Sequence, residues 1–389
     1  MTSKLEELIA KLCPNGVEYK KIGDIADYEQ PTKYIVKSTK YDDSFTTPVL
    51  TAGQSFILGY TDELDDIYLA SKDNPVIIFD DFTGAIQWVD FPFKVKSSAM
   101  KMITTKSNVL IRYLYHWMSL LGFSSSEHKR LWISTYSNFE IPVPPLDVQA
   151  EIVRILDTFT ELTAELTAEL TARKKQYEYY RDTLLTFDDN NPLHSLISRY
   201  CPNGVEYKKI KDVYLRIKGT PITASKMKKI ASEDGEVRIF AGGKTVINAH
   251  ESDIPKANIT RVPAVLVQSR GVIDVVYYDK PFTFKNEMWA YTSDSSIGVK
   301  FLYYLLKNNI QYFRDAASGM GSLPQISLHV TEDFEIPVPP LEVQNQIVQI
   351  LDRFDALCND LTQGLPAEIE ARRKQYEYYR DQLLTFKRA

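Results

Sequence analysis

The residues of this chain that could do chemistry stand at spacings that catalytic and phosphate-binding sites do not use. Residues 242–245 read GGKT, the end of a phosphate-binding loop, but that motif also needs a glycine at position 238, which is Arg238. Residues 18–20 and 206–208 have the Glu-x-Lys spacing of some nucleases without a preceding aspartate in a suitable strand. The five histidines have neither metal-ligand nor catalytic-triad spacing. We therefore expect no catalytic, cofactor-binding or metal-binding residue in this chain.

Composition restricts the class of protein further. A chain of 389 residues, 44% of them hydrophobic, can form two or three domains with buried cores. The net charge of −5 is not the basic balance usual for a nucleic-acid binder, so affinity for nucleic acid would need local patches or a basic partner. The sequence contains no run of 18 apolar residues, so no membrane span is predicted. The first 12 residues lack a signal-peptide pattern. Three distant cysteines favour reduced thiols in a cytoplasmic protein.

The elements that would position any site occur twice, because three segments of the sequence are repeated. The repeated segments are CPNGVEYKKI at 13–22 and 201–210, FEIPVPPL at 139–146 and 334–341, and KQYEYYRD at 175–182 and 374–381. The inserts between them, residues 23–138 and 211–333, look unrelated. Gene duplication alone explains two copies, but it does not explain why the frame stays identical while the inserts diverge. Identical frames suggest two identical partners, and divergent inserts suggest two different ligands.

Each repeat ends in a helical pattern. Apolar residues recur at steps of three and four from residue 146 to 187, which predicts one long helix with a coiled-coil seam. A second such helix begins at residue 342 and is expected to break at Gly364-Leu365-Pro366. The tetrapeptide run TELTAELTAELTA at 160–172 would lengthen the first helix by about 6 Å per unit. This run could set a distance or be a plain solvated linker, and the sequence leaves both interpretations open.

Both inserts predict strands followed by an amphipathic helix. In the first, residues 50–60, 74–82, 85–95 and 99–105 read as strands, and the helix follows from about residue 109 to 121. The second insert has the same plan. We therefore expect an α+β protein with two mixed α/β domains related by pseudo-two-fold symmetry and separated by two long antiparallel coiled-coil helices.

Several loops have side chains that suit contact with DNA. Residues 268–271 (QSRG) offer an amide and a guanidinium, the two commonest readers of base edges, and the matching residues 80–84 could accept hydrogen bonds from cytosine or simply form a turn. Residues 208–229 are rich in lysine, which suits phosphate. For any one of these residues, a solvated loop is the simpler interpretation. The candidate DNA contacts are Gln30, Lys33, Gln54, Lys94, Lys96, Lys129, Arg130, Lys218, Thr220, Lys244, Gln268, Arg270, Lys285, Ser322 and Gln325.

The repeated KQYEYYRD segment suggests a face on which a partner docks, because tyrosine and arginine are enriched at interface hot spots. The alternative is that the tyrosines complete the core of the coiled coil. The candidate docking residues are Tyr177, Tyr180, Arg181, Tyr376, Tyr379 and Arg380.

The whole chain resembles the specificity subunits of Type I restriction–modification systems. The resemblance is carried by the duplicated CPNGVEYKK segment, the FEIPVPPL segment with the VQ and ILD motifs after it, the KQYEYYRD ending and the tetrapeptide run. It implies two target recognition domains, each reading one half of a bipartite, asymmetric site in double-stranded DNA, and helices that bind two methyltransferase subunits. Motor and nuclease subunits would join them. S-adenosylmethionine, ATP and Mg²⁺ would be bound by those partners and not by this chain, which would be non-catalytic.

On this basis we expect recognition domains at residues 1–145 and 189–340, a central helical spacer at 146–188 and a distal helical region at 341–389. The main competing hypothesis is a coiled-coil adaptor whose inserts bind protein and do not read DNA. A third hypothesis, an enzyme with an unrecognised site, would require activity of the isolated chain.

Overall fold

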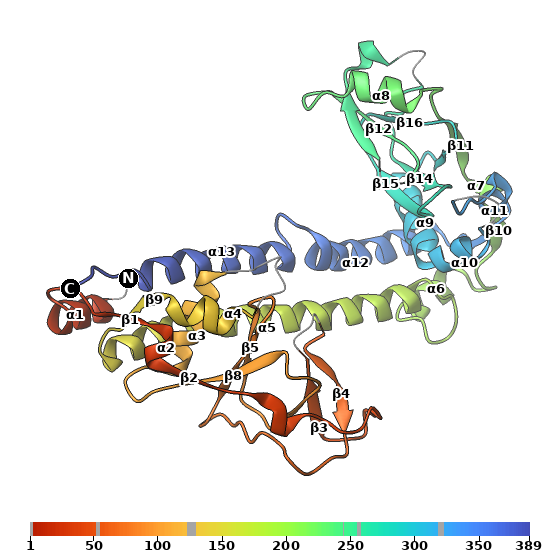
Figure 1. The fold of residues 1–389 in the computed structure, drawn as a ribbon. Coiled ribbons are helices and arrows are strands. Elements are labelled where there is room, and N and C mark those ends of the chain that lie inside the picture. Colours follow the sequence, from red (N-terminus) through yellow and green to blue (C-terminus); the bar gives the residue numbers. More distant parts are fainter. Residues whose placement is uncertain (1–2, 52–54, 123–129, 244, 255–257, 318–322) are drawn as a thin grey trace. The chain divides into compact units, whose positions relative to one another are not determined.

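The computed structural model describes residues 3–51, 55–122, 130–243, 245–254, 258–317 and 323–389 (Figure 1). The chain divides into two compact units, which are Met1–Thr167 together with Glu368–Ala389, and Ala168–Ala367. The helices α5 (Leu146–Leu184) and α13 (Leu365–Leu383) contribute residues to both units.

The first unit mixes short helices with three small sheets. Before α5 its helices are α1 (Ser3–Leu12), α2 (Ile22–Ile25), η1 (Pro31–Tyr34), α3 (Ile111–Leu121), α4 (Leu131–Ser134) and η2 (Tyr136–Asn138). Its strands are β1 (Tyr19–Lys21), β2 (Ala26–Glu29), β3 (Thr47–Leu50), β4 (Ile57–Thr61), β5 (Val76–Asp80), β6 (Ile86–Val89), β7 (Lys94–Val95), β8 (Met100–Thr105) and β9 (Glu140–Pro142). The sheet orders are β2-β8-β5-β6, β4-β3-β7 and β1-β9.

The second unit has its strands in the same order, while its short helices differ in part. Its helices after α5 are α6 (His194–Tyr200), α7 (Ile210–Val213), α8 (Ala224–Ile230), η3 (Glu251–Asp253), α9 (Ser296–Asn308), α10 (Ile310–Asp315), α11 (Leu328–Glu332) and α12 (Leu341–Asn359). Its strands are β10 (Tyr207–Lys209), β11 (Leu215–Lys218), β12 (Val237–Phe240), β13 (Val246–Ala249), β14 (Ala264–Gln268), β15 (Asp274–Tyr278), β16 (Phe282–Phe284), β17 (Trp289–Thr292) and β18 (Glu335–Pro337).

The sheets of the two units match strand for strand. The orders β11-β17-β14-β15, β13-β12-β16 and β10-β18 repeat those of the first unit, each three-stranded sheet having one antiparallel and one parallel pair. The registers of the smallest sheets agree as well, since Tyr19 faces Pro142 as Tyr207 faces Pro337. The expected α+β class and the shared plan of the two inserts are therefore confirmed.

Two of the expected strands are wrong. Residues 50–60 are not one strand, because they contain the end of β3 and most of β4, two strands that pair antiparallel with each other. Residues 85–95 contain β6 and β7, which belong to different sheets. Pro92 lies between them, and proline has no N–H to donate to the hydrogen bonds of a sheet. The strand is therefore interrupted there, although apolar residues stand on both sides.

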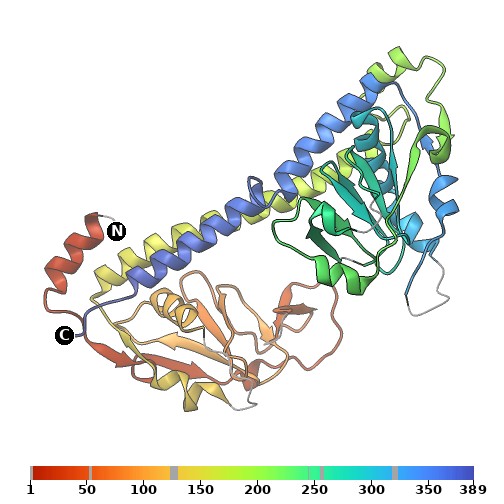
Figure 2. The same ribbon diagram turned by 90° about the horizontal axis from the view of Figure 1, so that it is seen from above.

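In the first unit, α13 runs alongside the early part of α5 (Figures 1 and 2). The pair is antiparallel, because Phe159 stacks on Tyr379 at 5.2 Å while Val148, Ile152 and Leu156 share a core with Leu383 and Leu384. In the second unit, α12 packs against the later part of α5, where Tyr177 and Tyr180 stack on Phe354. The long first helix and the break near residue 364 are confirmed, since α5 has 39 residues and α13 begins at Leu365.

A polar network ties the helix pair of the first unit to α3. The fully buried ring of His116 lies 3.0 Å from Asp157 Oδ1 through Nε2 and 3.0 Å from the Tyr376 hydroxyl through Nδ1. An ionised carboxylate only accepts, so Nε2 donates to Asp157 and Nδ1 accepts from Tyr376. Arg112 also donates to Asp157, at 2.7 Å. Burial lowers the pKa of His116, which keeps the imidazole neutral.

The two ends of the first unit's sequence are joined by backbone hydrogen bonds. Val17 N donates to the carbonyl of Lys387 (2.9 Å), and Ala389 N donates to the carbonyl of Val17 (3.0 Å). The Tyr19 hydroxyl adds a bond to the carbonyl of Phe386 (2.8 Å). Residues 385–389 are therefore structural parts of the first unit.

Candidate nucleic-acid interface

Four segments of the second unit converge at the end of its four-stranded sheet, and we call residues 242–243, 268–271, 285–288 and 323–326 the tip of this unit. The turn 268–271 joins β14 to β15, and Arg270 in it forms an isolated antiparallel bridge with Gln325. Two backbone bonds flank the bridge, from Gly271 N to Pro324 O (2.9 Å) and from Ile326 N to Ser269 O (3.0 Å). Residues far apart in sequence are thus held side by side.

Glycine lets a third segment approach this turn. Gly243 and Gly271 both have positive φ, +73° and +80°, which costs a glycine little. Gly243 N donates to the carbonyl of Arg270 at 3.3 Å, and a side chain on Gly271 would reach the backbone of Gly243 at 3.8 Å. The backbone around Arg270 is therefore fixed, while its side chain is exposed and has no partner among the described residues.

The turn between β16 and β17 supplies the fourth segment of this tip. Lys285 forms an ion pair with Glu287, its Nζ 2.8 Å from Oε1, and the Ser269 hydroxyl donates to the carbonyl of Glu287. Two hollows flank this turn. A mainly apolar cavity of about 690 Å³ is lined by Met227, Val272, Leu323, Arg270, Lys285 and Glu287 among others.

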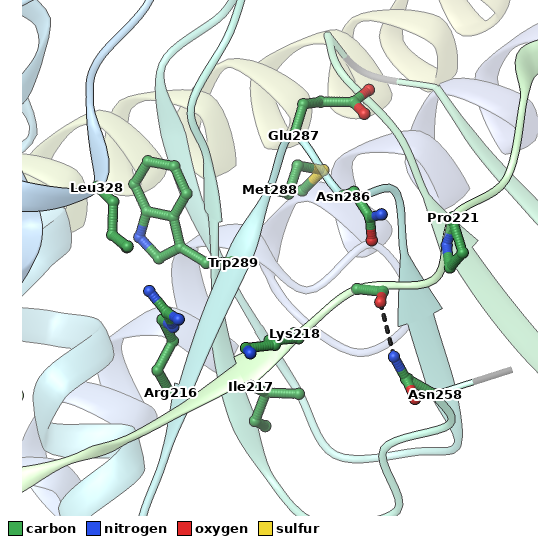
Figure 3. Close-up of a pocket in the computed structure, with 11 residues that line it drawn as sticks. Arg216, Ile217, Lys218, Pro221, Asn258, Asn286, Glu287, Met288, Trp289 and Leu328 are labelled. Carbon is green, nitrogen blue, oxygen red and sulfur yellow. Dashed lines mark hydrogen bonds between the residues drawn. The ribbon is translucent and has the colours of Figure 1, made fainter.

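The second hollow, of about 600 Å³, lies on the other side of the same turn, and we call it the polar cleft because a larger share of its lining is polar than in the cavity. Figure 3 shows Arg216 beside Trp289 and Leu328 at one end, with Asn286 and Asn258 toward the other. The cleft keeps this shape because its walls are tied down. Asn258 Nδ2 donates to the carbonyl of Gly219 (2.9 Å), and Trp289 Nε1 donates to Thr331 (2.9 Å).

The structure brings together Arg270, Gln325 and Lys285 from the predicted DNA contacts. Gln268 and Thr220 lie nearby but are buried, at 6% and 0% exposure, so they support the tip and cannot reach DNA as placed. Lys218 is exposed and lines the polar cleft. Glu287 was missed by the sequence analysis, because nothing in the sequence places residue 287 beside residue 270.

The first unit has an equivalent tip built from different side chains. Its turn, residues 80–84, is closed by Asp80, whose Oδ1 accepts from Phe82 N (2.8 Å) and Thr83 N (3.2 Å). Asp81 is buried against Lys101, with 3.4 Å between Oδ2 and Nζ, and accepts from Trp132 N at 2.9 Å. The two aspartates are buried and hydrogen-bonded within the fold, so of the two interpretations the turn is correct and the cytosine contact is not.

Arg130 lies at this first tip as Gln325 does at the second. The next residue, Leu131, donates its N–H to the carbonyl of Asp81 at 2.8 Å, just as Ile326 does to Ser269. Arg130 is exposed. The same backbone frame thus presents phenylalanine, threonine and arginine in one unit, and arginine, glutamate and glutamine in the other.

The remaining candidates of the first unit are spread over its surface and core. Gln30 and Lys33 are exposed at η1, and Lys96 is exposed with its Nζ 3.2 Å from the Tyr41 hydroxyl. Lys94 does not fit a DNA contact, because it is 1% exposed, paired with Glu63 at 3.2 Å and bonded to the carbonyl of Asp65. The candidates Gln54, Lys129, Lys244 and Ser322 lie outside the described residues.

Several cations of the basic segment 208–229 form ion pairs with carboxylates in the fold. Lys208 pairs with Glu206, Lys209 and Lys211 pair with Asp333, and Arg216 pairs with Glu332. Lys218, Lys226, Lys228 and Lys229 have no carboxylate partner among the described residues. The unpaired cations are therefore those at β11 and α8, next to the two hollows.

The candidate docking tyrosines pack within the two helix pairs. Tyr177 and Tyr180 contact Phe354, Tyr379 contacts Phe159, and Tyr376 contacts His116, with burial raising the pKa of Tyr376 to about 12. Arg181 and Arg380 are half-buried and each pairs with the aspartate that follows it. In contrast, Tyr179 and Tyr378 are each 63% exposed. The alternative in which tyrosines complete the core therefore holds for these four, and the exposed tyrosine of each repeat is a different one.

Other kinds of site find little support in the part of the chain that the structure describes. No described helix is both long and apolar enough to cross a membrane. No group of three or more His, Cys, Asp and Glu side chains among the described residues is arranged to hold a metal ion.

Comparison with known proteins gives one consistent family. The model of the Type I restriction modification DNA specificity domain matches residues 14–173 and again residues 202–371. A specificity subunit of a Type I restriction enzyme from Escherichia coli is 43% identical over 397 residues, covering 95% of this chain and 94% of that protein.

Two solved structures have a similar fold at low identity. The S subunit of a Type I restriction-modification system from M. genitalium aligns with a TM-score of 0.69 at 14% identity, covering 95% of this chain and 97% of that one. A chain from a structure concerning complex assembly and conformational transition of the Type I system aligns with a TM-score of 0.50 at 16% identity, covering 95% and 98%.

Proposed function

This chain belongs to the Type I restriction–modification DNA specificity family, and we propose that it reads a bipartite, asymmetric site in double-stranded DNA, one half-site with each unit. The observation that carries this proposal is the pair of equivalent tips. Their strand orders correspond, and the bond from Leu131 N to Asp81 O matches that from Ile326 N to Ser269 O, while their side chains differ. A repeated frame with different exposed donors and acceptors is what two unlike half-sites require.

We propose residues 1–145 and 189–340 as the two target recognition domains, with helical regions at 146–188 and 341–389 that space them and bind partners. The partners are two methyltransferase subunits, which motor and nuclease subunits join. Catalysis, S-adenosylmethionine, ATP and Mg²⁺ belong to those partners, and this chain acts as a non-catalytic cytoplasmic subunit. A net charge of −5 fits such a division, because basic partners can supply most phosphate contacts.

For docking, we propose Tyr179 and Tyr378 as the central contacts. They occupy the same position in the two copies of KQYEYYRD and are equally exposed, at 63%. Two identical exposed tyrosines suit two copies of one partner, since a tyrosine covers a large contact area and loses little conformational entropy.

The test is to exchange residues 23–138 for the corresponding insert of another family member and to map binding with methyltransferase subunits present. We expect one half-site to change while the other half-site and the gap stay as they were. Selection of bound duplexes from a random library gives the readout. If the unmodified complex selects no sequence at all, the adaptor hypothesis, in which the inserts bind protein, replaces this one.

A further inference from the structure

We infer that the β16–β17 turn separates two kinds of DNA contact in the second unit. Arg270 and Glu287 read base edges from the apolar cavity, and Lys218 with Arg216 holds backbone phosphate in the polar cleft. This inference rests on the proposed function, and it identifies which residues carry sequence information.

The side chains that line the cavity complement the groups on a base edge. Base edges in the major groove offer acceptors, amino donors and the thymine methyl group. Arg270 supplies donors from a fixed backbone, Glu287 supplies an acceptor, and Met227, Val272 and Leu323 supply an apolar wall. All of these side chains line one cavity of about 690 Å³.

Glu287 lines both hollows, but its carboxylate lies on the cavity side, because its Oε1 is next to Lys285 and Gly242, which line only the cavity. The position of this carboxylate argues against phosphate in the cavity. A carboxylate repels phosphate, so a surface that only gripped the DNA backbone would have no use for one. The ion pair with Lys285 at 2.8 Å fixes this carboxylate and offsets part of its charge. A carboxylate with one such partner retains lone pairs, and it can accept from the amino group of cytosine.

The polar cleft differs from the cavity in the cations and amides that line it. Arg216 and Lys218 are two residues apart in β11, so their side chains lie on the same face of the strand. Both line the cleft (Figure 3). Lys218 has no carboxylate partner among the described residues, and Arg216 keeps donors free beside its 3.3 Å contact with Glu332. Asn258 and Asn286 add amide groups, which commonly bind phosphate and sugar.

The turn stands between the two hollows. Lys285 lines the cavity, Asn286 lines the cleft, and Glu287 lines both. Since the base and the phosphate of one strand lie next to each other, adjacent hollows of different chemistry suit them.

The experiment uses the full chain with its methyltransferase subunits and four single variants. Base readers are tested with Arg270→Ala and Glu287→Gln, and the phosphate contact with Lys218→Gln. Glu233→Gln is the control, because Glu233 is an exposed carboxylate of the same unit that lines neither hollow. Each complex selects from a random duplex library, and its affinity is measured from low to high salt.

Arg270→Ala and Glu287→Gln should each lose about 5- to 150-fold discrimination at one or two positions of the second half-site, with the first half-site unchanged. Lys218→Gln should weaken all sequences alike and reduce the salt slope by about one. The control should change neither quantity.

Unchanged discrimination at the other positions of the second half-site shows in the same assay that the second unit of each variant is folded. The inference is overturned if Arg270→Ala and Glu287→Gln weaken all sequences equally, or if Lys218→Gln changes the selected bases. Failure of the proposed function is a separate result, in which the unmodified complex selects no sequence.

Discussion

Asp81 and Lys101 form a buried ion pair at the first tip, with side chains 3% and 1% exposed. The ring of Tyr28 lies over the ammonium group, 4.8 Å away. Because both side chains are almost fully buried, removing either one would leave the other charge without its partner. The pair therefore fixes the turn that leads to the exposed residues of this tip.

Breaking this pair should destabilise the first unit strongly. Lys101→Met leaves an unpaired buried carboxylate, and we expect the free energy of unfolding to fall by about 3–5 kcal/mol. The double variant Lys101→Met with Asp81→Asn removes both charges and keeps an acceptor for Trp132 N, so it should regain most of the loss. Denaturant unfolding measures both. Equal losses in the single and double variants would contradict this account.

His116 predicts a pH dependence of stability. Its pKa is lowered in the folded chain by burial, so the unfolded chain binds more protons below about 6.5. The contribution of neutral His116 to the stability of the folded chain is therefore fully present above that pH. It is lost as the pH falls toward the pKa of His116 in the folded chain. The ionisation of Asp157 affects stability separately, at a lower pH. Burial alone would raise its pKa, but the hydrogen bonds from His116 and Arg112 lower it below the ordinary 3.8.

We expect the unfolding midpoint of the first unit to drop between pH 7.5 and pH 5.5, and His116→Gln to show a smaller drop. The charged groups near the ring are Arg112, Arg380 and Asp157, and the lowered pKa of Asp157 keeps this carboxylate ionised between the two pH values. Thermal unfolding at the two pH values measures the difference. The same drop in the variant would remove His116 as its cause.

Sequence could predict residue types at the tips but not their exposure. Lys94 and Lys101 are lysines in strands, and only their partners from elsewhere in the chain make them core residues. Within KQYEYYRD the sequence does not say which tyrosine faces the neighbouring helix, because that depends on the rotation of the helix pair. The cations of residues 208–229 likewise depend on Glu332 and Asp333, over 100 positions away.

At the scale of elements, local patterns predicted α5 well because its apolar steps continue without glycine or proline. The repeated Tyr-Lys-Lys strands also kept their register in both units. Predictions failed where strands are short and the sheet is chosen by distant partners, as at β3 and β4 or β6 and β7. A strand's sheet is decided by pairing across the chain, which periodicity does not contain.

The tetrapeptide run gives a prediction for α5. The Thr163 hydroxyl donates to the carbonyl of Phe159 and the Thr167 hydroxyl to that of Thr163, so each unit of the run closes on the previous turn. Deleting residues 163–166 shortens the helix by about 6 Å and changes its phase by only about 40°. We expect the gap between the half-sites to narrow by one or two base pairs and both half-sites to stay the same.

A two-residue deletion, 163–164, is the matched control, because it rotates the later part of α5 by about 200°. It should weaken the complex rather than shorten the gap. Library selection reports both outcomes. A four-residue deletion that altered the recognised bases would show that the run does not set a distance.

At the scale of the whole molecule, Tyr179 and Tyr378 are exposed at equivalent positions of the two repeats. Replacing one of them should therefore abolish the binding of one methyltransferase subunit and leave the other bound. Tyr179→Ala and Tyr378→Ala should each lower the number of bound methyltransferase subunits from two to one, and the double variant should bind none. Mass measurement of the assembled complex gives the count. Tyr180→Ala is the control, because its ring packs on Phe354 and its loss should lower stability. Two bound subunits in every variant would place docking elsewhere.

The first unit contains both Met1–Thr167 and Glu368–Ala389. During synthesis, all of the second unit is translated before the backbone partners of Val17, Lys387 and Ala389, exist. The unit encoded first is therefore the one completed last, and a ribosome that stops after residue 367 releases a chain with every residue of its second unit while its first unit lacks residues 368–389.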